Sequence, residues 1–157
     1  MAACNNPDRF GAGGAGANGA GGFVDTNGLG DPNDPTSIAY FNQTVGDRVL
    51  FAVDQSTLSP EGRTVLEGQS QWLAANPNYA IIIEGHADEQ GTREYNLALG
   101  ARRAAAVQQF LMAQGVAPDR MKTISYGKER PIEVCSEEAC YSRNRRAVTV
   151  LSMGSGV

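Results

Sequence analysis

Two periodicities of hydrophobic positions divide most of the chain after residue 47 into strands and helices. Four short runs are either continuously apolar or alternate apolar with polar residues, which is typical of β-strands; they cover residues 48–53, 80–83, 121–126 and 147–152. Two longer segments repeat apolar residues every three or four positions, which indicates amphipathic helices; they cover residues 60–75 and 94–114. The pattern therefore predicts the order strand, helix, strand, helix, strand, loop, strand.

Residues that start and stop helices support these boundaries. Ser59 and Pro60 form a typical N-cap and first-turn pair before the first helix, and residues 76–78 (Asn-Pro-Asn) end it. Gly115 follows the second helix, with Pro118 three residues later. Because two helices that each bury an apolar stripe need a sheet face to bury it against, we expect an α/β two-layer sandwich, with both helices packed on a four-stranded mixed sheet.

Composition divides the chain into three parts. Residues 1–35 are rich in Gly, Ala, Asn and Asp and contain few large apolar side chains, so they should form a flexible tether that cannot offset the entropy of ordering. We expect residues 36–152 to form one folded domain and residues 153–157 a short tail. No apolar run reaches the roughly 18 residues that a membrane-spanning helix needs. The formal net charge of -4 gives no electrostatic reason to expect a nucleic-acid partner.

The three cysteines suggest two separate roles. Cys135 and Cys140 are close neighbours in a polar stretch, which favours a short disulfide in an oxidising compartment. Free thiols are an alternative, and a metal site is a weaker one, because two cysteines without nearby histidines supply half of a zinc ligand set. Cys4 follows two alanines and precedes the predicted tether, as in the lipidation site of a bacterial lipoprotein. An acylated Cys4 would anchor the protein in a membrane; the alternative is an unmodified thiol.

Charged side chains gather where two predicted strands end. Asp54 follows the first strand, and Asp88 lies in the loop after the second. Both loops connect the end of a strand to a helix, so we expect them at one edge of the sheet. Arg103, expected on a polar face of the second helix, is long enough to lean back toward the loop. A cleft between the two side chains would suit a zwitterion, with Asp88 accepting from an ammonium and Arg103 holding a carboxylate.

Two other interpretations of the charged residues stay open. Asp88 and Arg103 could pair only with each other, as a loop-to-helix salt bridge. Arg143 and Arg145 lie shortly before the last strand. They belong either to a solvent-exposed segment that leads into the strand or to an anion-facing wall of the same cleft.

Four segments resemble the OmpA-like peptidoglycan-binding domain family, and the resemblance extends over residues 48–151. The segments are VLFAVDQSTLSPEG (49–62), EGHADEQGTREYNLALGARRAAAV (84–107), ISYGKERP (124–131) and YSRNRRAVTV (141–150). The resemblance implies a periplasmic domain that binds the diaminopimelate residue of the peptidoglycan peptide stem non-covalently, without catalysis and without a cofactor.

The resemblance also implies a role for particular residues. The family's ligand-binding aspartate and arginine fall on Asp88 and Arg103, and its aspartate after the first strand falls on Asp54. Asn96 and Leu99 lie in the stretch that leads to the arginine. All five residues are therefore expected to bind diaminopimelate.

Location and partners follow from the lipoprotein members of the family. Their acylated N-terminal cysteine, here Cys4, anchors them to the inner leaflet of the outer membrane, which they tether to the cell wall. The resemblance further implies partnership with TolB and other Tol components. Cys135 and Cys140 occupy a loop in which the family has no cysteine pair.

Two other functions compete with this interpretation. Glu84, His86 and Asp88 alternate along one extended stretch, as in a metal-assisted hydrolase. However, His86 is the only histidine, so we expect neither catalysis nor a bound metal. The second alternative is a protein-binding module whose Asp88/Arg103 cleft receives TolB or another periplasmic partner instead of peptidoglycan.

Overall fold

The computed structural model describes residues 30–132, 134 and 137–153. The chain divides into two compact units, residues 1–44 and residues 45–157. In the described part of the first unit, helix α2 (Ile38–Tyr40) is capped by the Ser37 hydroxyl, which accepts a hydrogen bond from a first-turn amide. The π-helix η2 (Phe41–Gly46) follows. The site described below lies wholly in the second unit.

The second unit is built on one four-stranded sheet. Its strands are β1 (Arg48–Leu50), β2 (Tyr79–His86), β3 (Met121–Gly127) and β4 (Arg146–Met153), arranged in the order β1-β4-β2-β3. β2 and β3 are parallel, whereas β4 is antiparallel to both β1 and β2. β1 and β2 therefore run in the same direction, and their C-terminal ends share one edge of the sheet with the N-terminal end of β4.

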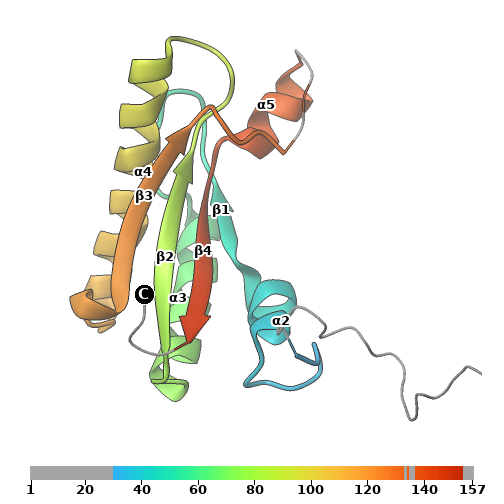
Figure 1. The fold of residues 1–157 in the computed structure, drawn as a ribbon, viewed down its shortest axis with the longest axis vertical. Helices are drawn as coiled ribbons and strands as arrows, with labels where there is room; N and C mark the ends of the chain where they lie inside the picture. Colours follow the sequence, from blue (N-terminus) through green and yellow to red (C-terminus); the bar gives the residue numbers. More distant parts are fainter. Residues whose placement is uncertain (1–29, 133, 135–136, 154–157) are drawn as a thin grey trace, which may run out of the picture. The chain divides into compact units, whose positions relative to one another are not determined.

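Two long helices cover one face of this sheet (Figure 1). α3 (Pro60–Ala75) follows the N-cap Ser59, and α4 (Arg93–Ala113) follows the N-cap Thr92; each cap hydroxyl accepts from a first-turn amide. The core between the layers includes the fully buried Leu66, Leu73, Ile81, Ile83, Val107 and Leu111. The structure thus confirms the predicted α/β sandwich.

Two glycines let α4 approach β2 closely. A Cβ atom on Gly85 would lie 1.7 Å from the carbonyl oxygen of Gly100, and a Cβ on Gly100 would lie 2.4 Å from the Ser125 hydroxyl oxygen. The first of these contacts involves backbone, so the helix would have to move to relieve it. This close approach brings the first turns of α4 beside the end of β2, where Asp88 follows.

Two local features differ from the sequence-based expectation. β1 ends at Leu50, not at residue 53, because the chain turns into a loop in which Asp54 has a φ of 57°. Residues 127–146 were expected to be a loop, but they include helix α5 (Glu138–Asn144). This helix is too short and polar to show a clear apolar period. In the part of the chain that the structure describes, no helix is long and apolar enough to cross a membrane.

Candidate functional site

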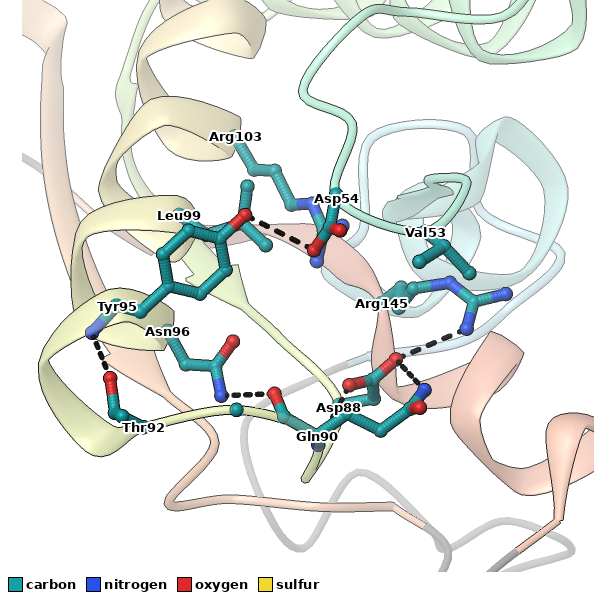
Figure 2. Close-up of a pocket in the computed structure, with 11 residues that line it drawn as sticks. Val53, Asp54, Asp88, Gln90, Thr92, Tyr95, Asn96, Leu99, Arg103 and Arg145 are labelled. Atoms are coloured by element: carbon teal, nitrogen blue, oxygen red, sulfur yellow. Dashed lines mark hydrogen bonds and ion pairs between the residues drawn. The ribbon is translucent and has the colours of Figure 1, made fainter.

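A pocket of about 500 Å³ opens at the sheet edge where β1 and β2 end and β4 begins (Figure 2). Its wall comes from the loops after β1 and β2, from the first turns of α4 and from the residue before β4. The lining residues are Val53, Asp54, Asp88, Gln90, Gly91, Thr92, Tyr95, Asn96, Leu99, Arg103 and Arg145. The two loops therefore converge at one edge, as their positions after β1 and β2 predicted.

Asp88 is buried in the pocket wall, with 7% of its surface exposed. Its Oδ1 accepts from the Gln90 amide at 3.0 Å, and its Oδ2 accepts from Gln90 Nε2 at 3.3 Å and from Arg145 Nη1 at 3.1 Å. The side chains of Asp88 and Arg145 are 8% and 5% exposed, so salt screens this ion pair less than a surface pair. Asp88 thus pairs with Arg145 and not with Arg103, the partner considered from the sequence.

Arg145 joins the loop after β1, the loop after β2 and helix α5. Its Nε donates to the Phe51 carbonyl at 2.9 Å, its Nη1 donates to Asp88, and both Nη atoms donate to the Glu138 carboxylate in α5. The hydrogen bond to Glu138 is the main reason that the pKa of Arg145 is raised, and it lowers the pKa of Glu138. Arg145 lies in the pocket wall, whereas Arg143, also considered for that wall, is not among the lining residues.

Arg103 is completely buried, so its predicted place on a polar helical face is wrong. Its Nε, Nη1 and Nη2 atoms donate to the carbonyls of Gln55 at 2.8 Å, His86 at 2.9 Å and Ala52 at 3.1 Å, respectively. Arg103 therefore holds the loop after β1 against the end of β2. Helical spacing could not reveal this burial, because the loop that covers the side chain comes from a distant part of the sequence.

The Arg103 guanidinium remains charged although it is buried. Desolvation lowers the pKa of Arg103 to about 10, and the charge of Asp88 acts in the opposite direction. The guanidinium also lies 5.1 Å from the centroid of the Phe51 ring, close enough for a cation–π contact. Because a guanidinium carries five N–H groups, the three bonds to carbonyls leave two N–H groups on the Nη atoms for another acceptor.

Asp54 and Tyr95 link the loop after β1 to α4. The Tyr95 hydroxyl donates to Asp54 Oδ1 at 3.1 Å (Figure 2), and this bond raises the pKa of Tyr95. Both residues are exposed, so the Asp54 carboxylate faces solvent while that of Asp88 is recessed. The sequence analysis missed Tyr95. Its place four residues before Leu99 and eight before Arg103 could have identified it, since this spacing puts all three on one helical face.

The loop after β2 is held in place by side chains from α4 and from the turn after β3. Asn96, which is buried, donates to the Gln90 carbonyl at 2.7 Å, and Lys128 Nζ donates to the Gly91 carbonyl at 3.0 Å. Leu99 adds a buried apolar side chain to the pocket wall. Both residues predicted near the ligand, Asn96 and Leu99, therefore line the pocket, and Asn96 also fixes the loop.

The residues that suggested a hydrolase are not gathered around one point. His86 is buried, its Nε2 lies 3.1 Å from Glu84 Oε1, and its ring stacks on Tyr126 at 5.5 Å. Asp88 instead bonds to Arg145 in the pocket. Among the residues that the structure describes, no group of three or more His, Cys, Asp and Glu side chains could hold a metal ion.

The structure bears on one of the predicted cysteine sites. Cys140, in α5, is disulfide-bonded. Cys4 and Cys135 lie outside the described residues, so the lipidation of Cys4 and the pairing of Cys140 with Cys135 stay predictions.

Comparison with known proteins shows the family of this chain. Residues 50–145 match the model of the OmpA family. The chain belongs to the OmpA family. Among OmpA-family relatives, the peptidoglycan-associated lipoprotein of Agrobacterium fabrum is 58% identical over 123 residues, which cover 78% of this chain and 69% of that protein. The protein of the same name from Brucella suis is 56% identical over 122 residues, covering 78% of this chain and 72% of that protein.

Two solved structures share the architecture of this chain. The crystal structure of the peptidoglycan-associated lipoprotein from Burkholderia pseudomallei has 38% sequence identity and a TM-score of 0.69, and the match covers 79% of this chain and 98% of that one. The C-terminal domain of Helicobacter pylori MotB has 21% identity and a TM-score of 0.64, covering 69% of this chain and 86% of that one. At that identity the second comparison shows a common fold alone.

Proposed function

We propose that this OmpA-family protein binds peptidoglycan non-covalently, without catalysis, and so tethers the envelope layer that carries it to the cell wall. Relatives named peptidoglycan-associated lipoprotein, at 56–58% identity, support this function. The observation that carries the proposal is the pocket, which combines two carboxylates with two guanidiniums: Asp54, Asp88, Arg103 and Arg145. Equal numbers of opposite charges suit a ligand that itself carries both signs.

The diaminopimelate residue of the peptide stem fits this pocket chemically. Its side chain ends in one carbon that carries both an ammonium and a carboxylate. Asp54 and Asp88 accept hydrogen bonds from the ammonium. Asp54 is exposed. Asp88 already accepts three hydrogen bonds, and because a carboxylate offers about four acceptor sites, one is left for the ligand. The ligand carboxylate lies on the side of Arg103, whose buried positive charge attracts it, and accepts from the backbone N–H groups at the N-terminus of α4. Asn96 and Leu99 complete the contact surface.

The proposal extends to location and partners. Acylation of Cys4 anchors the protein at the periplasmic face of the outer membrane, and residues 1–35 span the distance to the cell wall. The protein acts with TolB in the Tol-Pal system, which supports envelope integrity and cell division, and TolB competes with peptidoglycan for the pocket. Simultaneous binding of TolB and peptidoglycan would contradict the competition, and membrane association unchanged by Cys4→Ser would contradict the anchor.

Co-sedimentation with purified peptidoglycan sacculi tests the binding function. The comparison uses the wild type, Asp88→Asn and the control Asp119→Asn, which makes the same charge change in the short helix η3 (Pro118–Arg120) beyond the far end of α4. We expect Asp88→Asn to weaken binding about tenfold or more, because it removes a charge-assisted contact. Asp119→Asn should bind like the wild type. Equal binding of all three folded proteins would refute the role of the pocket.

A further inference from the structure

Glu138 lies outside the wall of the binding pocket and bonds to Arg145, which lines it. It is the first residue of α5, its side chain is 66% exposed, and it is not among the lining residues. Its two carboxylate oxygens accept from both Nη atoms of Arg145, the bidentate arrangement that fixes a guanidinium most firmly. Since Arg145 Nη1 also donates to Asp88 at 3.1 Å, the three side chains form one continuous row of charges from the surface of α5 into the pocket.

The charges along this row decide which ligand group Asp88 can attract. Asp88 and Arg145 together carry no net charge, and such a neutral pair attracts an ammonium weakly. With Glu138 the three groups carry one net negative charge. The Arg145 guanidinium is then shared between two carboxylates, so it neutralises Asp88 only in part. Because Arg145 lowers the pKa of Glu138, Glu138 stays ionised at neutral pH.

The position of Arg145 depends on the same contact. Its side chain is 5% exposed, and its Nε is held by the Phe51 carbonyl at 2.9 Å. The end of the guanidinium therefore has two carboxylate partners, Asp88 on the pocket side and Glu138 on the α5 side. If Glu138 is lost, Asp88 remains as its carboxylate partner, and Arg145 then competes directly with any ammonium that approaches Asp88.

We propose that Glu138 is a positioning residue for ligand binding. It draws the Arg145 guanidinium toward α5 and offsets its charge, and this leaves Asp88 able to accept a ligand ammonium. This inference rests on the proposed function, and it adds to the pocket a residue that does not touch the ligand.

A pair of probes separates this electrostatic role from a purely structural one. The first probe is the tripeptide L-Ala-γ-D-Glu-meso-diaminopimelate, and the second is the same tripeptide acetylated at the free amine of diaminopimelate, which removes the ammonium charge. Affinities are measured by NMR titration for the wild type, Glu138→Gln, Glu138→Asp and Glu137→Gln. Glu137 is the matched control, because it is the exposed neighbour of Glu138 and gives the same charge change.

The expected result is specific to the charged probe. Glu138→Gln weakens binding of the unmodified tripeptide about fivefold, the effect of one partly screened charge at close range. Glu138→Asp keeps most of the wild-type affinity for this tripeptide, and the affinity of Glu137→Gln stays within about twofold of the wild type. The acetylated tripeptide binds more weakly to every protein, and its affinity does not depend on residue 138.

Three results would overturn the inference. If the wild type binds and Glu138→Gln behaves like Glu137→Gln, the positioning role is refuted while peptidoglycan binding stands. If Glu138→Gln weakens both probes equally, Glu138 only holds α5 in place. If the wild type binds neither the tripeptides nor sacculi, the proposed function fails together with this inference.

Discussion

Replacing Arg103 by methionine removes a buried cation whose donors hold the pocket loops together. Methionine keeps a long unbranched side chain, so the substitution changes the charge and the hydrogen bonds more than the packing. It removes the side-chain donor of the carbonyls of Ala52, Gln55 and His86, which accept from Arg103 at 2.8–3.1 Å in the wild type. The Ala52 carbonyl keeps its bond from the Gln55 amide. We therefore expect Arg103→Met to destabilise the fold in addition to affecting ligand binding.

The size of the effect follows from the burial of the partners. Hydrogen bonds from a charged group contribute about 1.5–3 kcal/mol each. Ala52 and Gln55 are exposed, so water can replace the donor at their carbonyls, whereas His86 is buried. Removing the charge also recovers part of the desolvation cost that lowers the pKa of Arg103 to about 10. The net loss should be about 3 kcal/mol, within the range for breaking a buried charged network.

Urea unfolding followed by the fluorescence of Trp72 measures this loss. Trp72 is the only tryptophan and is 7% exposed, so its emission should change when the core opens. With a typical slope for a domain of this size, about 3 kcal/mol lowers the unfolding midpoint by roughly 1.5–2 M urea. The control is Arg102→Met, an exposed neighbour on α4, which should shift the midpoint by less than about 0.5 M. Equal midpoints for the two variants would refute the structural role of Arg103.

Further predictions concern the contact between α4 and β2 and the pH dependence of stability. Gly85→Ala should lower the free energy of unfolding by more than about 3 kcal/mol or prevent folding, because its methyl group would lie 1.7 Å from the Gly100 carbonyl oxygen. The control is Gly68→Ala in α3, where the added methyl group would have its nearest neighbour at 3.7 Å. This variant should leave the free energy of unfolding unchanged or raise it by up to about 1 kcal/mol. Similar urea midpoints for the two variants would contradict the close approach of α4 to β2. Burial and then the charge of Arg146 lower the pKa of His86 below 6.5, so the unfolded chain binds a proton that the folded chain does not. The free energy of unfolding should therefore fall as the pH drops below about 6.5, by at most about 1.4 kcal/mol per pH unit. His86→Gln should remove this pH dependence. A wild type whose free energy of unfolding is constant between pH 6.5 and 5.5 would contradict the prediction.

Much of the fold could be predicted because it depends on local patterns. The N-cap Ser59 begins α3, the apolar period gives both α3 and α4, and the alternating or apolar runs give strands β2, β3 and β4. The end of β1 could not be predicted, since residues 51–53 remain apolar while the backbone already turns toward Asp54. Helix α5 was missed because it is short and polar and so shows no clear apolar period.

The candidate pocket was predictable in composition but not in its internal bonding. The position of Asp54 and Asp88 after two strands of the same direction was enough to bring them to one cavity. That Asp88 pairs with Arg145, and that Arg103 is covered by the loop after β1, depends on how distant segments pack. Helical spacing gives the face of a residue on its own helix and does not say which loop will cover that face.

The central claim is that the pocket recognises an ammonium and a carboxylate on one carbon. Release of the protein from sacculi by competing tripeptides tests this claim most directly. The wild type is bound to sacculi and then titrated with L-Ala-γ-D-Glu-meso-diaminopimelate or with the matching tripeptide that carries L-lysine at the third position. Lysine keeps the ammonium but lacks the neighbouring carboxylate. We predict release by the diaminopimelate tripeptide at concentrations at least about tenfold lower than by the lysine tripeptide. Equal release by both, or release by neither, would contradict the account.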